Sequence, residues 1–179
     1  MHPSTLLAAG LLTGSLVLTA GGAWADSDSV KDKAGDAAPA GDITKVTVRN
    51  TGKALTIQTK LKKASAGRTH VVATLTSATE GAATYVARTV ESGHGHRVGA
   101  TLETSAPDAT DPTTTVATPV DCQRLHAAVS SGRNGMVTIR IPQSCFGADA
   151  GTFTVAVTTV TPAGAVVDQT SSDPTVDEG

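Results

Sequence analysis

Hydrophobic and polar residues alternate along most of the chain, which is the pattern of β-strands that bury one face. The clearest example is segment 136–145, where three aliphatic residues alternate with Thr138 and Arg140. Pro142 then removes a backbone donor and ends the strand. The same alternation predicts further strands at 46–49, 55–61, 69–77, 83–90, 97–103, 116–120, 153–158 and 165–169.

Turn signals at short intervals, such as Asn50-Thr51-Gly52-Lys53 and Pro162-Ala163-Gly164, separate these segments. Strands of similar length joined in this way predict an all-β fold, an antiparallel β-sandwich of about nine strands, immunoglobulin-like or jelly-roll-like. One short helix is expected at 123–131, because Leu125, Ala128 and Val129 fall at i, i+3 and i+4.

The first 25 residues have the pattern of a secretory signal peptide. An apolar run at 6–20 ends in Ala23-Trp24-Ala25, which predicts cleavage between Ala25 and Asp26. No Lys or Arg precedes the run, and a retained membrane anchor is the alternative. We therefore expect a secreted, extracellular and monomeric protein, with no membrane association after cleavage. Its parts are a flexible acidic lead-in (26–41), a β-sandwich domain (42–169) and an acidic C-terminal tail (170–179).

Both cysteines, Cys122 and Cys145, belong to the exported part. An oxidising compartment pairs such cysteines, so we expect one disulfide bond between them. A free thiol or a metal site is the alternative, but the sequence places no further ligands near the pair.

The net charge of −2 hides a segregation of charge along the chain. Segment 45–68 contains seven Lys and Arg residues and no acid, whereas both ends of the exported chain are acidic. Such a segment can attract an anionic partner. The alternative is that its cations lie on the solvent faces of two early strands and protect a sheet edge. Nucleic acid is not expected as a partner, because the whole chain is mildly acidic.

Asp32, Asp36 and Asp42 lie at close spacing around Gly35. Ca²⁺ takes six to eight oxygen ligands, and closely spaced carboxylates can supply them. The acids near the C-terminus could join from a neighbouring strand end. The alternative is a solvated tail in which Asp42 caps the first strand.

His94 and His96 flank Gly95, so both rings would project to the same side of an extended segment. Two imidazoles at this spacing can hold Zn²⁺ or Cu²⁺ if a third ligand arrives, such as His70 or Glu91. An exposed turn without metal is the alternative interpretation.

Several activities have no support in the sequence. There is no Gly-x-Ser-x-Gly elbow, no His-Glu-x-x-His and no phosphate-binding loop. The predicted mature chain has only Tyr85, Phe146 and Phe153 as aromatics, which disfavours binding through stacked sugars or bases.

The chain resembles a group of small, uncharacterised secreted proteins of actinobacteria. The resemblance lies in Asp42-Ile43 after an acidic lead-in, in Cys122, and in a strand that runs through Pro142 into Ser144-Cys145-Phe146-Gly147. It implies a β-sandwich with a disulfide bond. A more distant likeness, to the β-sandwich appendages of extracellular glycan-active enzymes, lies in the Asp/Gly lead-in alone. Neither likeness supplies a catalytic residue.

Together these features predict a secreted, non-catalytic binding or interaction domain for an unknown extracellular partner, with no cofactor. One alternative is a Ca²⁺-stabilised accessory module that recognises cell-wall or polysaccharide material. A second is a metal-dependent extracellular enzyme centred on His94 and His96.

Overall fold

The computed structural model describes residues 25–91, 98–108, 110, 114–147 and 151–177. Within these residues the protein is all-β, and the strand pairings are antiparallel. Apart from Ala25, the predicted signal peptide lies outside the described part of the chain.

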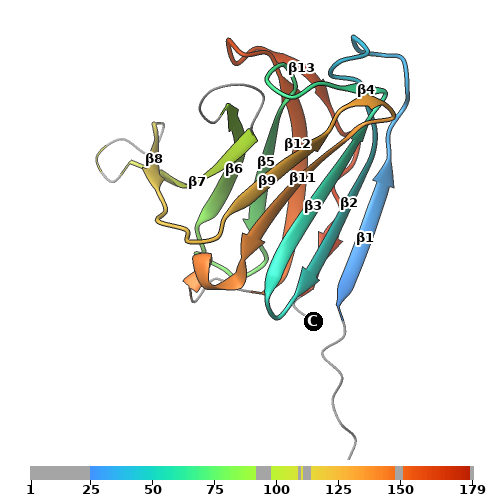
Figure 1. Ribbon diagram of the computed structural model, residues 1–179. Helices are drawn as coiled ribbons and strands as arrows, with labels where there is room; N and C mark the ends of the chain where they lie inside the picture. The colour runs from blue at the N-terminus through green and yellow to red at the C-terminus, as the bar shows by residue number, and fades with distance from the viewer. Residues whose placement is uncertain (1–24, 92–97, 109, 111–113, 148–150, 178–179) are drawn as a thin grey trace, which may run out of the picture.

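Two large sheets form the molecule (Figure 1). The first, which we call sheet A, has the strand order β1-β2-β3-β11-β9. Its strands are β1 (Asp26–Lys31), β2 (Ile43–Thr51), β3 (Ala54–Leu61), β11 (Met136–Pro142) and β9 (His126–Ser130).

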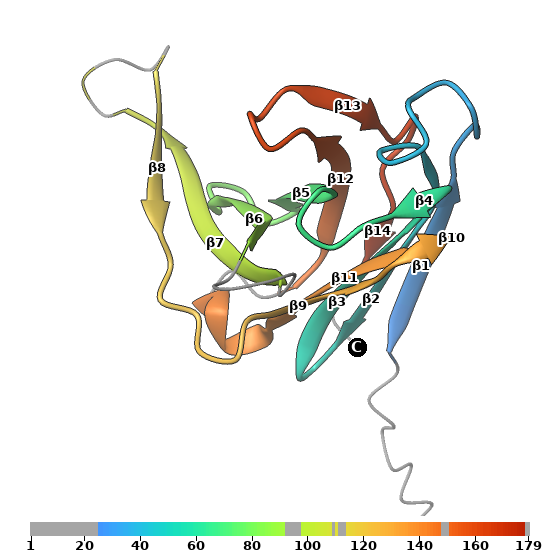
Figure 2. The same ribbon diagram turned by 45° about the horizontal axis from the view of Figure 1, so that its top comes forward.

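The second, sheet C, has the order β13-β12-β5-β6-β7-β8, and β14 also pairs with β12. Its strands are β13 (Val166–Gln169), β12 (Phe153–Val160), β5 (His70–Ser77), β6 (Thr84–Glu91), β7 (Val98–Pro107), β8 (Thr115–Pro119) and β14 (Thr175–Val176). A short ribbon of β4 (Lys63–Ala64) and β10 (Gly132–Arg133) completes the strands. Figure 2 shows sheets A and C as two layers, with β1 and β8 at opposite ends of the molecule.

The core lies between the two layers and follows the alternation of the sequence. Sheet A contributes buried residues such as Ile57, Val137 and Ile139, and sheet C contributes Leu75 and Val155. The intervening residues of each strand face solvent. Burial of these aliphatic side chains, at about 25 cal/mol per Å² of apolar surface, is the main driving force for folding.

The described aromatic residues meet at one end of this core. The Phe146 ring lies 4.6 Å from the Phe153 ring and 5.1 Å from the Tyr85 ring, centroid to centroid. The Tyr85 hydroxyl donates a hydrogen bond of 3.0 Å to the Phe146 carbonyl oxygen. All three rings are buried, so none is exposed for stacking against a ligand.

The helix predicted at 123–131 is wrong. Residues 126–130 form β9, which pairs with β11 so that Ala127 lies opposite Ile139 and Val129 opposite Val137. A helix of nine residues is marginal by itself, and pairing with the most hydrophobic strand of sheet A outweighs its weak periodicity. The helical structure described is one 3₁₀ turn, η1 (Gln143–Cys145), directly after β11.

Both ends of the predicted mature chain are more ordered than their composition predicts. Residues 26–31 of the expected flexible lead-in form β1, and residues 175–176 of the tail form β14 with Val176 fully buried. The Asp28 carboxylate accepts a hydrogen bond of 3.0 Å from the Thr175 amide, and Asp26 accepts one of 2.8 Å from the Asp177 amide. Acidic residues that indicate a solvated tail therefore fasten the two ends to each other.

The predicted disulfide bond joins Cys122 and Cys145, whose Cα atoms lie 5.2 Å apart. Among the described residues, no helix has the length and apolar character needed to span a membrane.

Candidate functional site

The outer face of sheet A carries a group of cations, and we call it the basic face. Strand pairing sets its side chains in three rows across the five strands. The rows are Ser27–Arg49–Thr56–Arg140–His126, Ser29–Thr47–Gln58–Thr138–Ala128 and Lys31–Lys45–Lys60–Met136–Ser130. Five of these residues are Lys or Arg, and none is an acid. The described residues form no ion pair with any of the five.

Three of the seven cations of the basic segment, Lys45, Arg49 and Lys60, therefore lie on the solvent face of β2 and β3, but they do not protect an edge. β2 and β3 are internal strands of sheet A, because β1 covers one and β11 covers the other. Edge protection does not explain cations at internal positions, so their role has to be sought on the face itself.

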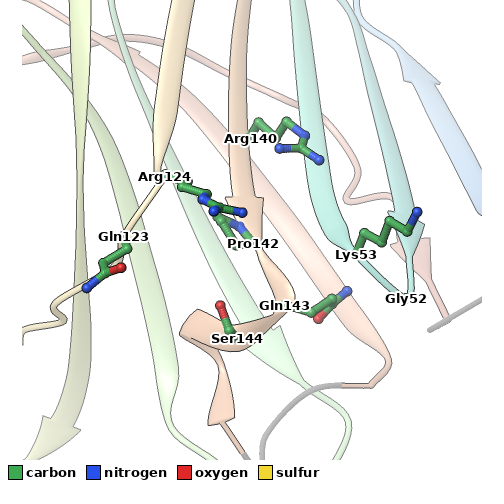
Figure 3. Close-up of a pocket in the computed structure, with 8 residues that line it drawn as sticks. All are labelled: Gly52, Lys53, Gln123, Arg124, Arg140, Pro142, Gln143 and Ser144. Atoms are coloured by element: carbon green, nitrogen blue, oxygen red, sulfur yellow. The ribbon is translucent and has the colours of Figure 1, made fainter.

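A hollow of about 500 Å³ lies beside the basic face, where β11 ends (Figure 3). It is lined by Gly52, Lys53, Gln123, Arg124, Arg140, Pro142, Gln143 and Ser144. Three of these side chains are cationic and none is acidic or aromatic. Arg140 belongs both to this hollow, which we call the basic pocket, and to the basic face.

Three separate chain segments form the basic pocket, and each is fixed in place. Gln143 follows Pro142 and is only 8% exposed. Its side-chain amide nitrogen donates to Asn50 Oδ1 and, at 3.0 Å, to the Thr51 carbonyl, while its backbone amide donates to the Lys53 carbonyl at 3.1 Å. The end of β11 is thereby tied to the turn between β2 and β3.

The disulfide bond fastens the third segment, which carries Gln123 and Arg124, to η1. Arg124 has a φ of 65°, in the left-handed region that residues other than glycine rarely adopt. Such a conformation costs on the order of 1 kcal/mol or more and persists only where surrounding structure enforces it. Two contacts hold Arg124 in this conformation. Cys122, two residues earlier, is fixed by the disulfide bond, and the Leu125 amide donates a hydrogen bond of 3.3 Å to the Cys122 carbonyl oxygen.

A second candidate site lies where the lead-in meets β13. Asp32, Asp36 and Asp168 each bring a carboxylate oxygen within 4.8 Å of the other two. Oδ2 of Asp32 is buried and has no hydrogen-bond partner among the described residues. The sequence predicts Asp32, Asp36 and Asp42 as ligands, with the acids near the C-terminus able to join them. Asp168 is such an acid, and it converges with Asp32 and Asp36.

The electrostatics of this acidic cluster favour a bound cation or proton. Burial raises the pKa of Asp168, and the nearby Asp32 and Asp36 carboxylates raise it further. Hydrogen bonds from the backbone amides of Ile43 and Gln169 oppose these effects. Three converging carboxylates offer up to six oxygens, which suits Ca²⁺.

Asp42, the third predicted Ca²⁺ ligand, is not a member of this cluster. It is fully buried, accepts a hydrogen bond of 2.8 Å from the Gly35 amide, and lies 3.7 Å from the Lys62 ammonium group. Asp42 therefore braces the loop that carries Asp36 and the start of β2.

His94 and His96 lie outside the described residues. Of the proposed third ligands, His70 begins β5 and Glu91 ends β6, and both line a hollow of about 260 Å³. Nδ1 of His70 lies 3.4 Å from the Thr89 carbonyl oxygen.

Comparison with known proteins leaves the chain without an assigned family. No protein-family model, curated protein or solved structure matches it.

Proposed function

We propose that this protein is a secreted, non-catalytic binding module that recognises an anionic extracellular partner through the basic face of sheet A. The observation that carries the proposal is the set of five Lys and Arg residues without an acid on one face of sheet A. Folding alone gives no reason for this array, because like charges side by side repel one another. The proposed architecture is a β-sandwich, immunoglobulin-like or jelly-roll-like, with the binding face on one layer.

Binding to immobilised anionic polysaccharides, measured against neutral dextran at increasing salt, tests the proposal. The wild type is expected to bind the anionic polymers only and to lose affinity as salt screens the charges. A Lys45→Gln/Arg49→Gln/Lys60→Gln variant removes three cations of the basic face and is expected to lose binding. Arg88→Gln, on the other sheet, is the matched control. Equal binding by wild type and triple variant would contradict the proposal.

We further propose that Ca²⁺ stabilises the module at Asp32, Asp36 and Asp168. The convergence of three carboxylates, one with a buried and unpartnered oxygen, supports this role. A ligand that binds only the folded state raises its stability, so the melting temperature should rise with Ca²⁺. Mg²⁺ is expected to act weakly, because it requires a tighter octahedral site. The rise should be lost in Asp168→Asn and retained in the control Asp173→Asn.

A further inference from the structure

We propose that the basic pocket binds a carboxylate-bearing saccharide, the acidic sugar unit of a polyuronate chain. This inference rests on the proposed role of the basic face, whose ligand class it names. It does not depend on the Ca²⁺ site.

The first support is the placement of Arg124. Its backbone lies in the left-handed region, and Cys122, two residues earlier, is held by the disulfide bond. The arginine side chain does not stabilise the fold through burial or an ion pair, because Arg124 is exposed and forms no ion pair with a described residue. Arg124 lines the same hollow as Arg140 and Lys53 (Figure 3), so the cost of its backbone conformation is best explained by a ligand in that hollow.

The second support is the amide of Gln143. It is more than nine-tenths buried, and its nitrogen is bound to Asn50 and Thr51. Its oxygen, Oε1, has no hydrogen-bond partner among the described residues. A buried carbonyl oxygen of this kind requires a donor, and a hydroxyl or a water that a small shift of the Gln143 side chain admits from the pocket would supply one.

These two features select the ligand. Arginine side chains bind planar carboxylates through paired hydrogen bonds, and Lys53 adds a third positive charge. Gln143 and Ser144 bring hydrogen-bonding groups that suit hydroxyls. The lining has no aromatic side chain, so recognition depends on charge and hydroxyl groups and not on ring stacking. A sugar acid combines both groups in one ring.

The cations beside the pocket suit a polymer of acidic sugars better than a single sugar acid. Arg140 shares a transverse row with Thr56 and Arg49, and β3 separates the strands that carry the two arginines. Neighbouring strands are about 4.8 Å apart, which sets the two arginines about 10 Å apart along the row. Arg49 also lines a smaller hollow of about 190 Å³ on the same face. A chain of acidic sugars that begins in the pocket would meet Arg49 as it crosses the strands.

Isothermal titration with oligogalacturonates tests the inference on the intact exported chain. The acidic tetramer is expected to bind more tightly than the monomer, while the fully methyl-esterified tetramer, which has the same rings without the charge, should not bind. Arg124→Asn, which tolerates a positive φ, and Lys53→Gln remove cations from two different walls. Each should weaken tetramer binding about tenfold or more, whereas Arg88→Gln on sheet C should change it less than about twofold.

The outcomes separate this inference from the proposed function. If the tetramer binds but neither pocket variant weakens it, while Lys45→Gln/Arg49→Gln/Lys60→Gln does, the pocket is overturned and the basic face stands. If polyphosphate or single-stranded DNA binds as tightly as the tetramer and is weakened as much by Arg124→Asn and Lys53→Gln, the pocket selects negative charge alone and the saccharide is overturned. If the wild type binds none of these polyanions, both proposals fail.

Discussion

The two outer faces of the molecule are built from the same kind of strand but carry different charge. The basic face of sheet A displays five Lys and Arg residues with no acid. The outer face of sheet C is rich in Thr and Val. Its cation on β6, Arg88, has Nε 3.8 Å from Oε2 of Glu103 on β7. Both faces are solvated, so solubility alone does not account for the difference.

The comparison separates charge that the fold neutralises from charge that it leaves available. On sheet C an arginine is matched by a neighbouring acid. On sheet A the acids lie elsewhere, since Asp26 and Asp28 point to the other side of β1 and bind the C-terminal segment. Asp26 and Asp28 thus lie at the junction with the C-terminal segment, whereas five Lys and Arg residues share the open face of sheet A. This sorting is what supports a binding role for sheet A alone.

Removing the disulfide bond should have the largest effect. The bridge spans a separation of 23 residues, and closing a loop of that length stabilises a fold by about 3 kcal/mol in the chain-entropy model. The Cys122→Ser/Cys145→Ser variant should therefore lose about 3 kcal/mol in urea unfolding followed by circular dichroism. A loss below about 1 kcal/mol would show that packing alone holds the segment that bears Arg124.

Truncating Gln143 should have the next largest effect. Gln143→Ala leaves the buried Asn50 Oδ1 and the Thr51 carbonyl without their donor, which costs about 1 to 3 kcal/mol. Gln58→Ala, in the middle of the basic face, is the matched control and should change the free energy of unfolding by less than about 0.5 kcal/mol. Equal losses in the two variants would mean that the amide network does not hold the pocket together.

Much of this arrangement follows from the sequence, because a period of two decides which side chains share a face. The alternation around Ile139 and around Ile57 predicts both the strands and their buried sides, and the charged residues between them are necessarily exposed. The two cysteines predict the bridge. The spacing of Asp32 and Asp36 around Gly35 predicts that their carboxylates lie close together.

The remainder depends on contacts between distant segments. Nothing local indicates that β1 adds to β2, since its residues are polar and its stability comes from carboxylates that reach Thr175 and Asp177. The basic pocket is equally invisible in the sequence, because Lys53, Arg124 and Arg140 come from three segments. Asp168, and not Asp42, is the third acid of the cluster, because strand ends and not sequence neighbours set which carboxylates converge.

The acidic junction should respond to pH in the opposite direction from a typical surface carboxylate. Because the folded state raises the pKa of Asp168 above 3.8, the folded protein binds this proton more tightly than the unfolded chain. Metal-free protein should therefore lose stability as the pH rises from about 3.8 through the raised pKa, and the loss should persist above it.

Asp168→Asn removes this titration, so the metal-free variant should be the more stable protein at neutral pH and should lack that part of the pH dependence. Thermal melts in EDTA between pH 3 and pH 7, compared for the two proteins, measure the effect. Parallel curves for both would contradict a raised pKa of Asp168 in the folded state.

The smallest expected effect comes from removing one cation on each face, which should change the free energy of unfolding in opposite directions. Lys45 and Lys60 lie directly opposite each other on β2 and β3, and like charges in that position are destabilising. Lys60→Gln should therefore raise the free energy of unfolding by about 0.2 to 0.5 kcal/mol at low salt. On sheet C, Arg88→Gln removes an attraction to Glu103 between half-exposed groups and should lower it by about 0.2 to 0.5 kcal/mol. Salt at 1 M reduces the Debye length to about 3 Å, so both changes should vanish there. A loss of stability in both variants would mean that the basic face is internally balanced after all, and its cations would then no longer point to an external anion.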